Sequence, residues 1–347
     1  MRKIRIGSRW VGEHHPCFII AEAGINHNGD IKIAKRMIDA AKRAGVDAVK
    51  FQTFKTKNLV TKNAKTAEHQ TDSKGKSQYE ILKSFELKED DFVKLSKYAK
   101  EKGIMFLSSP FDRESVDLLE KLKVPAFKIA SSEITNFPLL RYIARKRKPI
   151  ILSTGMANLD EIREALDVIF NEGNKEVILL HCISAYPAKM EELNLRAIES
   201  LKRSFNLPVG FSDHTENILA SLVAVAVGAC VVEKHFTLDK NLPGPDHKFS
   251  LEPDELKEMV RTIRLVESSL GDGIKKPTKS EEKIKKFVRR SIVARTKITR
   301  GTIIKREMLD VKRPSGGIEP KYIDAIIGKK AKRDIKEDEI ITWDMIG

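Results

Sequence analysis

The chain has 347 residues, with 64 lysines and arginines against 49 acidic residues and a formal net charge of +15. Because the basic residues alternate with acidic ones and only 6% of residues are aromatic, we expect a solvated surface that attracts a small anionic substrate and no nucleic-acid partner. No apolar run approaches the roughly 20 residues that span a membrane, and the N-terminus lacks a signal-peptide core, which predicts a cytoplasmic protein without a membrane partner.

Eight short apolar runs recur in the N-terminal two thirds of the chain, and each of them ends in polar residues. The runs are rich in β-branched residues, nearly continuous in hydrophobicity and separated by helical patterns, as parallel strands covered on both faces must be. They are residues 18–24, 48–53, 104–110, 125–133, 149–155, 177–187, 208–215 and 230–237. Eight strands alternating with helices predict an α/β fold of the (β/α)8 type, a TIM barrel.

The carboxyl ends of the eight predicted strands carry most of the chemically useful side chains. In a TIM barrel these ends meet at one face, so residues far apart in the sequence become neighbours there. The polar residues expected at that face are Glu22, Lys50, Gln52, Ser109, Lys128, Ser131, Ser153, His181, Asp213, His214, Glu233 and His235. A single serine of this set could merely cap a helix, but the whole set favours an active site.

Two histidines end consecutive predicted strands, at His214 and His235. A lone strand histidine is usually a core residue, whereas two with acidic neighbours indicate a metal site. Structural zinc takes four protein ligands and catalytic zinc three, so two imidazoles completed by water and substrate oxygens favour Mn²⁺, Mg²⁺ or Co²⁺. Asp213 or Glu233 could orient one of the imidazoles.

Two lysines, Lys50 and Lys128, are expected to act as fixed cations for a phosphate or a carboxylate. Glu22 lies near them and is the general acid/base candidate, with a simple ion pair as the alternative. No Walker-type loop occurs, and the GINHNG segment at Gly24 does not match the dinucleotide fingerprint. Neutral donors for a small phosphorylated acid are expected from Ser109, Ser131, Ser153, Ser184 and Ser212.

The chain is predicted to divide after its last barrel helix. That helix should cover residues 253–270, with Asp254 as its N-cap and Gly271 as its C-terminal stop. A charged segment that contains the helix-breaking sequence Lys-Pro-Thr follows, which is typical of a linker. We therefore predict a catalytic barrel at residues 1–274, a linker at 275–289 and a small domain at 290–347.

The small C-terminal domain contains an internal repeat with an offset of 37 residues. The repeat predicts two related hairpin or strand-plus-turn units in a compact β-rich domain, either presenting Arg313 in a loop or serving as an oligomerisation or spacer domain. Its first copy has Ile298, Gly301, Ile303, Ile304, Met308 and Leu309, and its second has Ile335, Asp338, Ile340, Ile341, Met345 and Ile346.

Ten motifs occur in a fixed order along the chain: AEAGINHNG, KFQTFK, FLSSPF, FKIASSE, ILSTGM, HCISAYP, FSDHT, EKHFTLD, PGPDHKFSLEP and VKRP. In this order they resemble the sialic acid (N-acetylneuraminate) synthase family, and residues 290–347 resemble its SAF domain, an antifreeze-like β-clip. The resemblance covers essentially the whole chain. It implies a transferase that condenses phosphoenolpyruvate with N-acetylmannosamine, releases phosphate, uses a divalent metal ion, usually Mn²⁺, and works as a domain-swapped homodimer.

The resemblance also implies roles for individual residues. It places the metal ion on His214 and His235, and it brings Arg313 of the partner subunit to the N-acyl group of the sugar. Two positions depart from common family residues, since Ser184 replaces an Asn of bacterial relatives and Ser109 replaces a Thr. The implied phosphoenolpyruvate contacts are Lys50, Ser109, Lys128, Ser131, Ser153 and Ser212. The implied sugar contacts are Gln52, Glu133, Tyr186, Asp246 and Phe287.

Three alternatives stay open at this point. The sugar could be a diacetamido trideoxy sugar, which would make the chain a legionaminate or pseudaminate synthase. Lys128 could be the nucleophile of a Schiff-base aldolase that acts on pyruvate. The C-terminal domain could make the chain a non-catalytic sugar-binding or ice-binding protein, although the set of polar strand ends argues against this.

Overall fold

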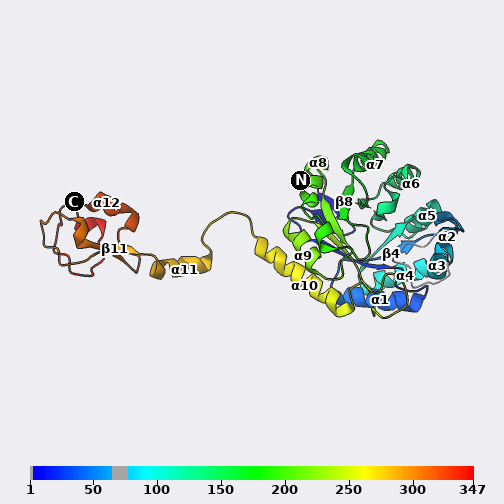
Figure 1. Cartoon of the computed structure of the whole chain (residues 1–347), viewed down its shortest axis with the longest axis horizontal. Helices are drawn as coiled ribbons and strands as arrows, with labels where there is room; N and C mark the ends of the chain where they lie inside the picture. The colour runs from blue at the N-terminus through cyan, green and yellow to red at the C-terminus, as the bar shows by residue number, and fades with distance from the viewer. Residues whose placement is uncertain (1–2, 65–76) are drawn as a thin grey trace. The chain divides into compact units, whose positions relative to one another are not determined.

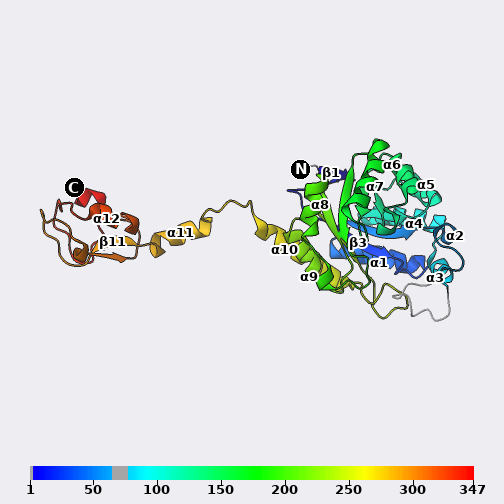
Figure 2. The same ribbon diagram turned by 45° about the horizontal axis from the view of Figure 1, so that its top comes forward.

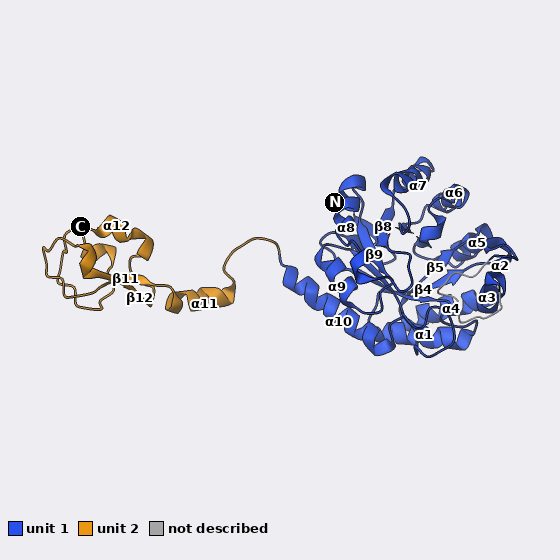
Figure 3. Cartoon of the chain, in the orientation of Figure 1, with its two compact units in different colours: residues 1–271 blue, residues 272–347 orange. Residues whose placement is uncertain are grey.

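The computed structural model describes residues 3–64 and 77–347, and the chain forms two compact units, Met1–Gly271 and Asp272–Gly347 (Figure 3). In the larger unit helices lie around the outside of a parallel sheet (Figures 1 and 2). Within the described residues, no helix has the length and apolar character required to cross a membrane.

The predicted barrel is confirmed. Its strands follow the order β5-β4-β3-β10-β9-β8-β7-β6, and β5 and β6 at the two ends of this order also contact each other, so the barrel is nearly closed. All neighbours are parallel. The strands are β3 (Phe18–Gly24), β4 (Ala48–Thr53), β5 (Met105–Pro110), β6 (Phe127–Ile129), β7 (Ile150–Ser153), β8 (Val177–Cys182), β9 (Val209–Asp213) and β10 (Val231–His235).

The helices between the strands begin and end at recognisable caps. The Asp30 side chain accepts from the Lys32 amide at 2.6 Å at the start of α1, and Gly45 ends that helix at φ +84°. The helices of this unit are α1 (Ile31–Ala44), α2 (Thr56–Leu59), α3 (Gln78–Phe85), α4 (Glu89–Lys102), α5 (Arg113–Lys121), α6 (Phe137–Ala144), α7 (Leu159–Asn171), α8 (Ala197–Phe205), α9 (Leu219–Ala226) and α10 (Pro253–Leu270).

Helix α10 has the predicted span and the predicted stop at Gly271, but its predicted N-cap is wrong. The N-cap is Glu252, two residues before Asp254, because Pro253 occupies the first helical position, where no amide donor is needed. The Glu252 amide donates to the Glu255 carboxylate at 2.8 Å in a capping box.

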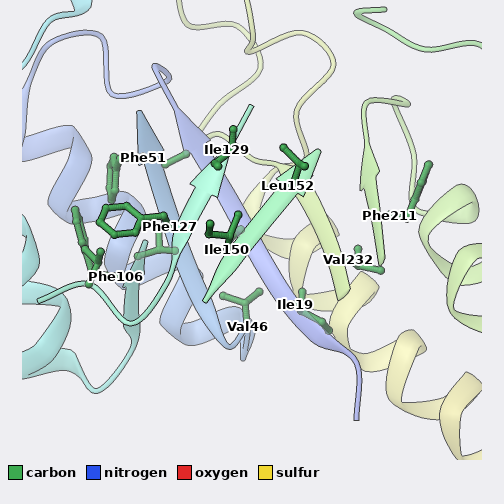
Figure 4. Close-up of a cluster of buried hydrophobic side chains, with 14 of the residues drawn as sticks. Ile19, Val46, Phe51, Phe106, Phe127, Ile129, Ile150, Leu152, Phe211 and Val232 are labelled. Carbon is green, nitrogen blue, oxygen red and sulfur yellow. The ribbon is translucent and has the colours of Figure 1, made fainter. Parts of the chain in front are cut away.

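The core has two layers, separated by the strand alternation. Ile19, Phe51 and Val232 face the helices in the larger cluster (Figure 4). Ile20 and Val231, their chain neighbours, lie with the residues that fill the barrel interior. On β10 the odd-numbered residues therefore face the barrel axis and the even-numbered ones face the helices.

An N-terminal hairpin that the sequence analysis did not predict packs against the barrel interior. It consists of β1 (Lys3–Ile6) and β2 (Arg9–Gly12), which pair in antiparallel register. Its buried residues Ile4, Ile6 and Val11 join the interior cluster. The apolar residues there lie at the amino ends of the strands, so the polar carboxyl ends form the opposite mouth.

The smaller unit contains helix α11 (Lys279–Val288), strands β11 (Ser291–Ala294) and β12 (Leu309–Lys312), and the short helix α12 (Ile323–Ile326). Helix α11 lies within the segment 275–289 that we predict to be a linker. The internal repeat is visible in the backbone, since Ile298 and Ile335, which correspond at the 37-residue offset, pair through amide-to-carbonyl bonds of 2.9 and 2.8 Å. Gly301 and Asp338 also correspond, and both have positive φ.

A side chain at Gly301, in the first copy of the repeat, is expected to lower the stability of the smaller unit. This glycine has φ +85° and an added Cβ would meet nothing within 4 Å, so only the backbone conformation opposes substitution. Gly301→Ala should lower the free energy of unfolding by about 1 kcal/mol, measured by urea denaturation. Asp338→Gly at the corresponding turn is the control. It relieves the strain of a positive φ and loses only an exposed ion pair with Lys312, so the free energy of unfolding should stay the same or rise. Equal destabilisation by both variants would contradict this account.

Candidate active site

Four oppositely charged side chains meet inside the carboxyl end of the barrel. Lys50 Nζ lies 2.7 Å from Glu22 Oε2 and 3.7 Å from Glu233 Oε2. Lys128 Nζ lies 3.2 Å from Glu233 Oε1. All four side chains are 4% exposed or less, so they are held by one another and not by solvent. We refer to Glu22, Lys50, Lys128 and Glu233 as the charged cluster.

The two carboxyl groups of the charged cluster have different proton affinities. Burial raises the pKa of Glu22 to about 7, although Lys50 opposes the shift. Burial also opposes ionisation of Glu233, but Lys128 and Lys50 outweigh it and lower the pKa of that carboxyl. Glu233 therefore stays ionised between the lysines, whereas Glu22 changes charge near neutral pH.

The ammonium groups also differ. Burial disfavours the charge of Lys50, but Glu22 and Glu233 outweigh it and raise the pKa of this amine. Burial lowers the pKa of Lys128, against the pull of Glu233. Below about pH 7, where Glu22 is protonated, the two cations face a single carboxylate, and the charged cluster favours an anionic ligand.

Serine hydroxyls surround the charged cluster. Ser109 Oγ accepts from Lys50 at 3.1 Å, and Ser212 Oγ donates to Glu233 at 3.1 Å. Ser131 Oγ accepts from the Gly155 amide at 3.0 Å. Ser153 Oγ is buried and has no hydrogen-bond partner among the described residues, so its proton can be donated to a ligand.

Gly155 lies at the point where this serine group is tightest. A Cβ atom there would collide with the hydroxyl of Ser184 and would lie 2.9 Å from that of Ser131. Only a glycine leaves room for both hydroxyls beside its amide. The half-buried Ser184 is thus brought to the same wall as Ser131, as the sequence predicts for an anion site.

The predicted histidine pair also meets at the mouth. The ring centroids of His214 and His235 lie 5.4 Å apart. His214 Nδ1 lies 2.7 Å from the Ile183 carbonyl oxygen. His235 Nδ1 is buried without a hydrogen-bond partner among the described residues, and it lies 3.9 Å from Asp246 Oδ2.

This arrangement fits a metal ion. With the Nδ1 proton of His214 donated to a carbonyl, the neutral form of that ring has its Nε2 lone pair available, although burial is outweighed by Cys182, which raises the pKa of His214. Burial keeps the pKa of His235 well below its usual value, so the His235 ring is neutral. Among the described residues no three His, Cys, Asp or Glu side chains group into a complete protein site. The two imidazoles would therefore need water or substrate oxygens as further ligands.

No described hydrogen bond joins Asp213 or Glu233 to an imidazole. The described contacts of Asp213 are with Lys234, Thr215 and Ser221, and those of Glu233 are within the charged cluster and with Ser212. The Ile183 carbonyl takes this part for His214. A backbone acceptor of this kind cannot be found from residue types.

The residues expected to face a sugar differ in their surroundings. Gln52 Nε2 donates to Glu22 Oε1 at 3.4 Å. Glu133 accepts from Ser132 Oγ at 3.0 Å and from Asn136 Nδ2 at 2.7 Å. The ring of Tyr186 lies 4.2 Å from that of His214.

Asp246 and Phe249 come from the segment that follows β10. Burial raises the pKa of Asp246 to about 6. Phe249, which sequence reasoning missed, packs 5.2 Å from the ring of His235 and 5.4 Å from that of Tyr186. It stands in the PGPDHKFSLEP motif, but an apolar residue in a polar segment gives no signal of its own.

One predicted strand-end histidine is held by a backbone carbonyl, and two further predicted residues belong to the other unit. His181 Nε2 lies 2.7 Å from the Leu193 carbonyl oxygen, which makes it a satisfied core histidine. Phe287 and Arg313 belong to the smaller unit, where both are exposed. Their contacts with a sugar remain predictions.

Comparison with known proteins places these features in a family. The family model described as "NeuB family" matches residues 37–275, and that of the SAF domain matches residues 289–347. An N,N'-diacetyllegionaminic acid synthase of Campylobacter jejuni is 52% identical over 93% of this chain and 98% of its own length. An N-acetylneuraminate-9-phosphate synthase of Homo sapiens is 41% identical over 97% and 95%.

A solved structure supports the same assignment. The crystal structure of an N-acetylneuraminic acid synthetase from Leptospira borgpetersenii, in complex with citrate, matches with a TM-score of 0.73 and 36% identity. The match covers 82% of this chain and 95% of that one. The predicted resemblance is confirmed, and this chain belongs to the NeuB family and carries an SAF domain.

Proposed function

We propose that this chain is a synthase that joins phosphoenolpyruvate to N-acetylmannosamine, giving N-acetylneuraminate and phosphate. The main support is that the ring centroids of His214 and His235 lie 5.4 Å apart, at the same barrel mouth as the charged cluster with its two buried lysines. Two relatives named N,N'-diacetyllegionaminic acid synthase, at 52% and 47% identity, make a diacetamido trideoxy sugar the second candidate.

The charged cluster and its serines would hold phosphoenolpyruvate. Lys50 and Lys128 are the fixed cations for its phosphate and carboxylate, and Ser153 has an unused hydroxyl to donate. Because the lysines are already held by Glu22 and Glu233, they need no reordering when the anion binds. This preorganisation favours binding of an anion over a neutral ligand of the same size.

The reaction needs an electrophilic aldehyde and a group that transfers a proton. A divalent ion on His214 and His235, with Mn²⁺ as first choice and Mg²⁺ or Co²⁺ as alternatives, would polarise the aldehyde of the open-chain sugar. The methylene carbon of phosphoenolpyruvate would then attack the aldehyde carbon, water would add to the pyruvyl carbon, and phosphate would leave by carbon–oxygen cleavage. Glu22, whose pKa is raised to about 7 by burial, would hold or release a proton in one of these steps.

One assay tests the proposed reaction and distinguishes between the candidate sugar substrates. Phosphate release from phosphoenolpyruvate is measured with N-acetylmannosamine and with the diacetamido trideoxy sugars that lead to legionaminate and pseudaminate, each with and without Mn²⁺. We expect Mn²⁺-dependent release with one of them, and kcat/KM identifies which. Absence of release with every sugar would contradict the enzyme and favour a sugar-binding protein.

A variant of Lys128 tests the anion site. Lys128→Met removes the ammonium and leaves Glu233 with a single cation, so KM for phosphoenolpyruvate should rise about 30-fold or more, as expected when one partner of a buried charge pair is truncated. Lys146→Met, which breaks an ion pair at the helices with Asp117, is the control and should leave this KM unchanged.

The same residue separates the synthase from a Schiff-base aldolase. The lowered pKa of Lys128 would suit a nucleophilic amine, but its ion pair with Glu233 favours a binding role. Borohydride with pyruvate should therefore give no covalent adduct. A trapped adduct at Lys128, located by mass spectrometry, would overturn the synthase mechanism.

The SAF domain enters the proposal through the partner subunit. We propose a domain-swapped homodimer in which Arg313 of one subunit reaches the N-acyl group bound in the other. If so, Arg313→Ala should raise KM for the sugar and leave KM for phosphoenolpyruvate unchanged. At a sugar concentration well below the KM of Arg313→Ala, a mixture of Arg313→Ala and His235→Ala subunits should show more activity than the two variants measured separately.

A further inference from the structure

A fully buried ion pair lies directly behind the two histidines. Lys234 Nζ is 3.0 Å from Asp213 Oδ1, and both side chains are 0% exposed. Both side chains point away from the barrel axis, toward the helices. Their chain neighbours Ser212 and Glu233 point toward the axis, where Glu233 is part of the charged cluster and Ser212 donates to it. Neither side chain contacts the charged cluster, so the proposed chemistry does not account for this pair.

The position of the pair in the sheet is informative. Asp213 and Lys234 are register partners on β9 and β10, and each immediately precedes one of the two histidines. The ion pair therefore bridges the two strands one residue before His214 and His235. The ion pair thus links the two strands next to the residues that carry the imidazoles.

The pair also fixes the chain on the far side of His214. Asp213 Oδ1 accepts from the Thr215 amide and hydroxyl, both at 2.8 Å, and Asp213 Oδ2 accepts from Ser221 Oγ of α9 at 2.6 Å. Lys234 Nζ donates to the carbonyl oxygen of Thr215 and lies 3.1 Å from its Oγ1. Both chain neighbours of His214 are thus held by one network.

A network of this kind is not explained by stability alone. Taking two charges out of water is costly, and a well-packed apolar pair is often as stable or more stable. A geometric role would give the pair a function, because metal ligands depend on the groups that orient them. The network meets this need for two ligands on adjacent strands at once.

We propose that Lys234 is a positioning residue that sets the spacing of His214 and His235 for a divalent ion through Asp213 and Thr215. This inference rests on the proposed metal-dependent function and adds a residue that does not touch substrate or metal. It predicts that removal of the network weakens metal binding more than it weakens phosphoenolpyruvate binding.

The test uses the full chain and Mn²⁺ alone. The double variant Asp213→Asn/Lys234→Met removes both charges without leaving one unpaired. Titration followed by the electron paramagnetic resonance signal of free Mn²⁺ should show a dissociation constant raised about tenfold or more. Calorimetry should give an unchanged dissociation constant for phosphoenolpyruvate. The control variant Asp117→Asn/Glu120→Gln/Lys146→Met, which removes all charges of a partly exposed ion-pair group on the helices, should bind Mn²⁺ like the wild type.

A milder variant keeps the test decisive if the double variant does not fold. Ser221→Ala removes one donor to Asp213 from α9 and keeps the ion pair, so the Mn²⁺ dissociation constant should rise about threefold. Unchanged Mn²⁺ affinity in the folded variants would overturn the inference alone. A wild-type chain that binds no Mn²⁺ would overturn the proposed metal site and this inference with it.

Discussion

Replacement of His235 by alanine is expected to lower kcat about 10³-fold and to abolish Mn²⁺ binding while the barrel stays folded. The loss corresponds to roughly 4 kcal/mol, the several kcal/mol that a Lewis acid contributes to a polarised carbonyl. The fold should persist because His235 Nδ1 is buried without a hydrogen-bond partner among the described residues, so its removal breaks no bond at that atom. Free Mn²⁺ in a titration and the melting curve from circular dichroism measure the two effects.

The control for this variant is another strand-end histidine. His181 is the next-to-last residue of β8 and is held by the Leu193 carbonyl, so His181→Gln should change the melting temperature and leave Mn²⁺ affinity within twofold of the wild type. Full activity of the wild-type enzyme in a chelator would contradict a metal-dependent reaction. Undiminished activity of His235→Ala would contradict the role of this side chain.

Strand β10 shows why so much of the barrel could be predicted from the sequence. Its run is short, apolar and closed by polar residues, and the same pattern occurs eight times, so the fold follows from periodicity alone. Glu233 and His235, two residues apart, reach the same mouth as predicted. The hairpin at residues 3–12 was missed because two four-residue strands give no such periodic signal.

Asp213 shows where the sequence misleads. It stands next to His214 in the chain, and this proximity suggests direct hydrogen bonding to an imidazole, which the structure does not show among its described contacts. Side chains of consecutive strand residues point to opposite faces, so the carboxylate meets Lys234 instead. Counting strand parity from the apolar residues could have revealed this pair, because Phe211 and Val232 face the same helices. The register that makes Asp213 and Lys234 neighbours, by contrast, requires the structure.

Replacement of Glu22 by glutamine is the second large effect that we expect. The variant keeps the shape of the side chain and removes its proton exchange, so kcat should fall about 10³-fold, within the range for a general acid or base. The KM for phosphoenolpyruvate should change much less, because Lys50 and Lys128 both remain. A stopped assay of phosphate release at saturating substrate measures the change.

The pH profile makes this prediction specific to proton transfer. Because the pKa of Glu22 is raised to about 7 by burial, the carboxyl group is protonated below that pH and ionised above it. A general acid would make kcat fall above about pH 7, and a general base would make it fall below that pH. In either case Glu22→Gln should remove the limb with its midpoint near pH 7. Glu86→Gln, which removes the charge of a carboxylate that accepts from Thr56 away from the charged cluster, should retain it. A limb that persists in Glu22→Gln would assign the proton transfer to another group.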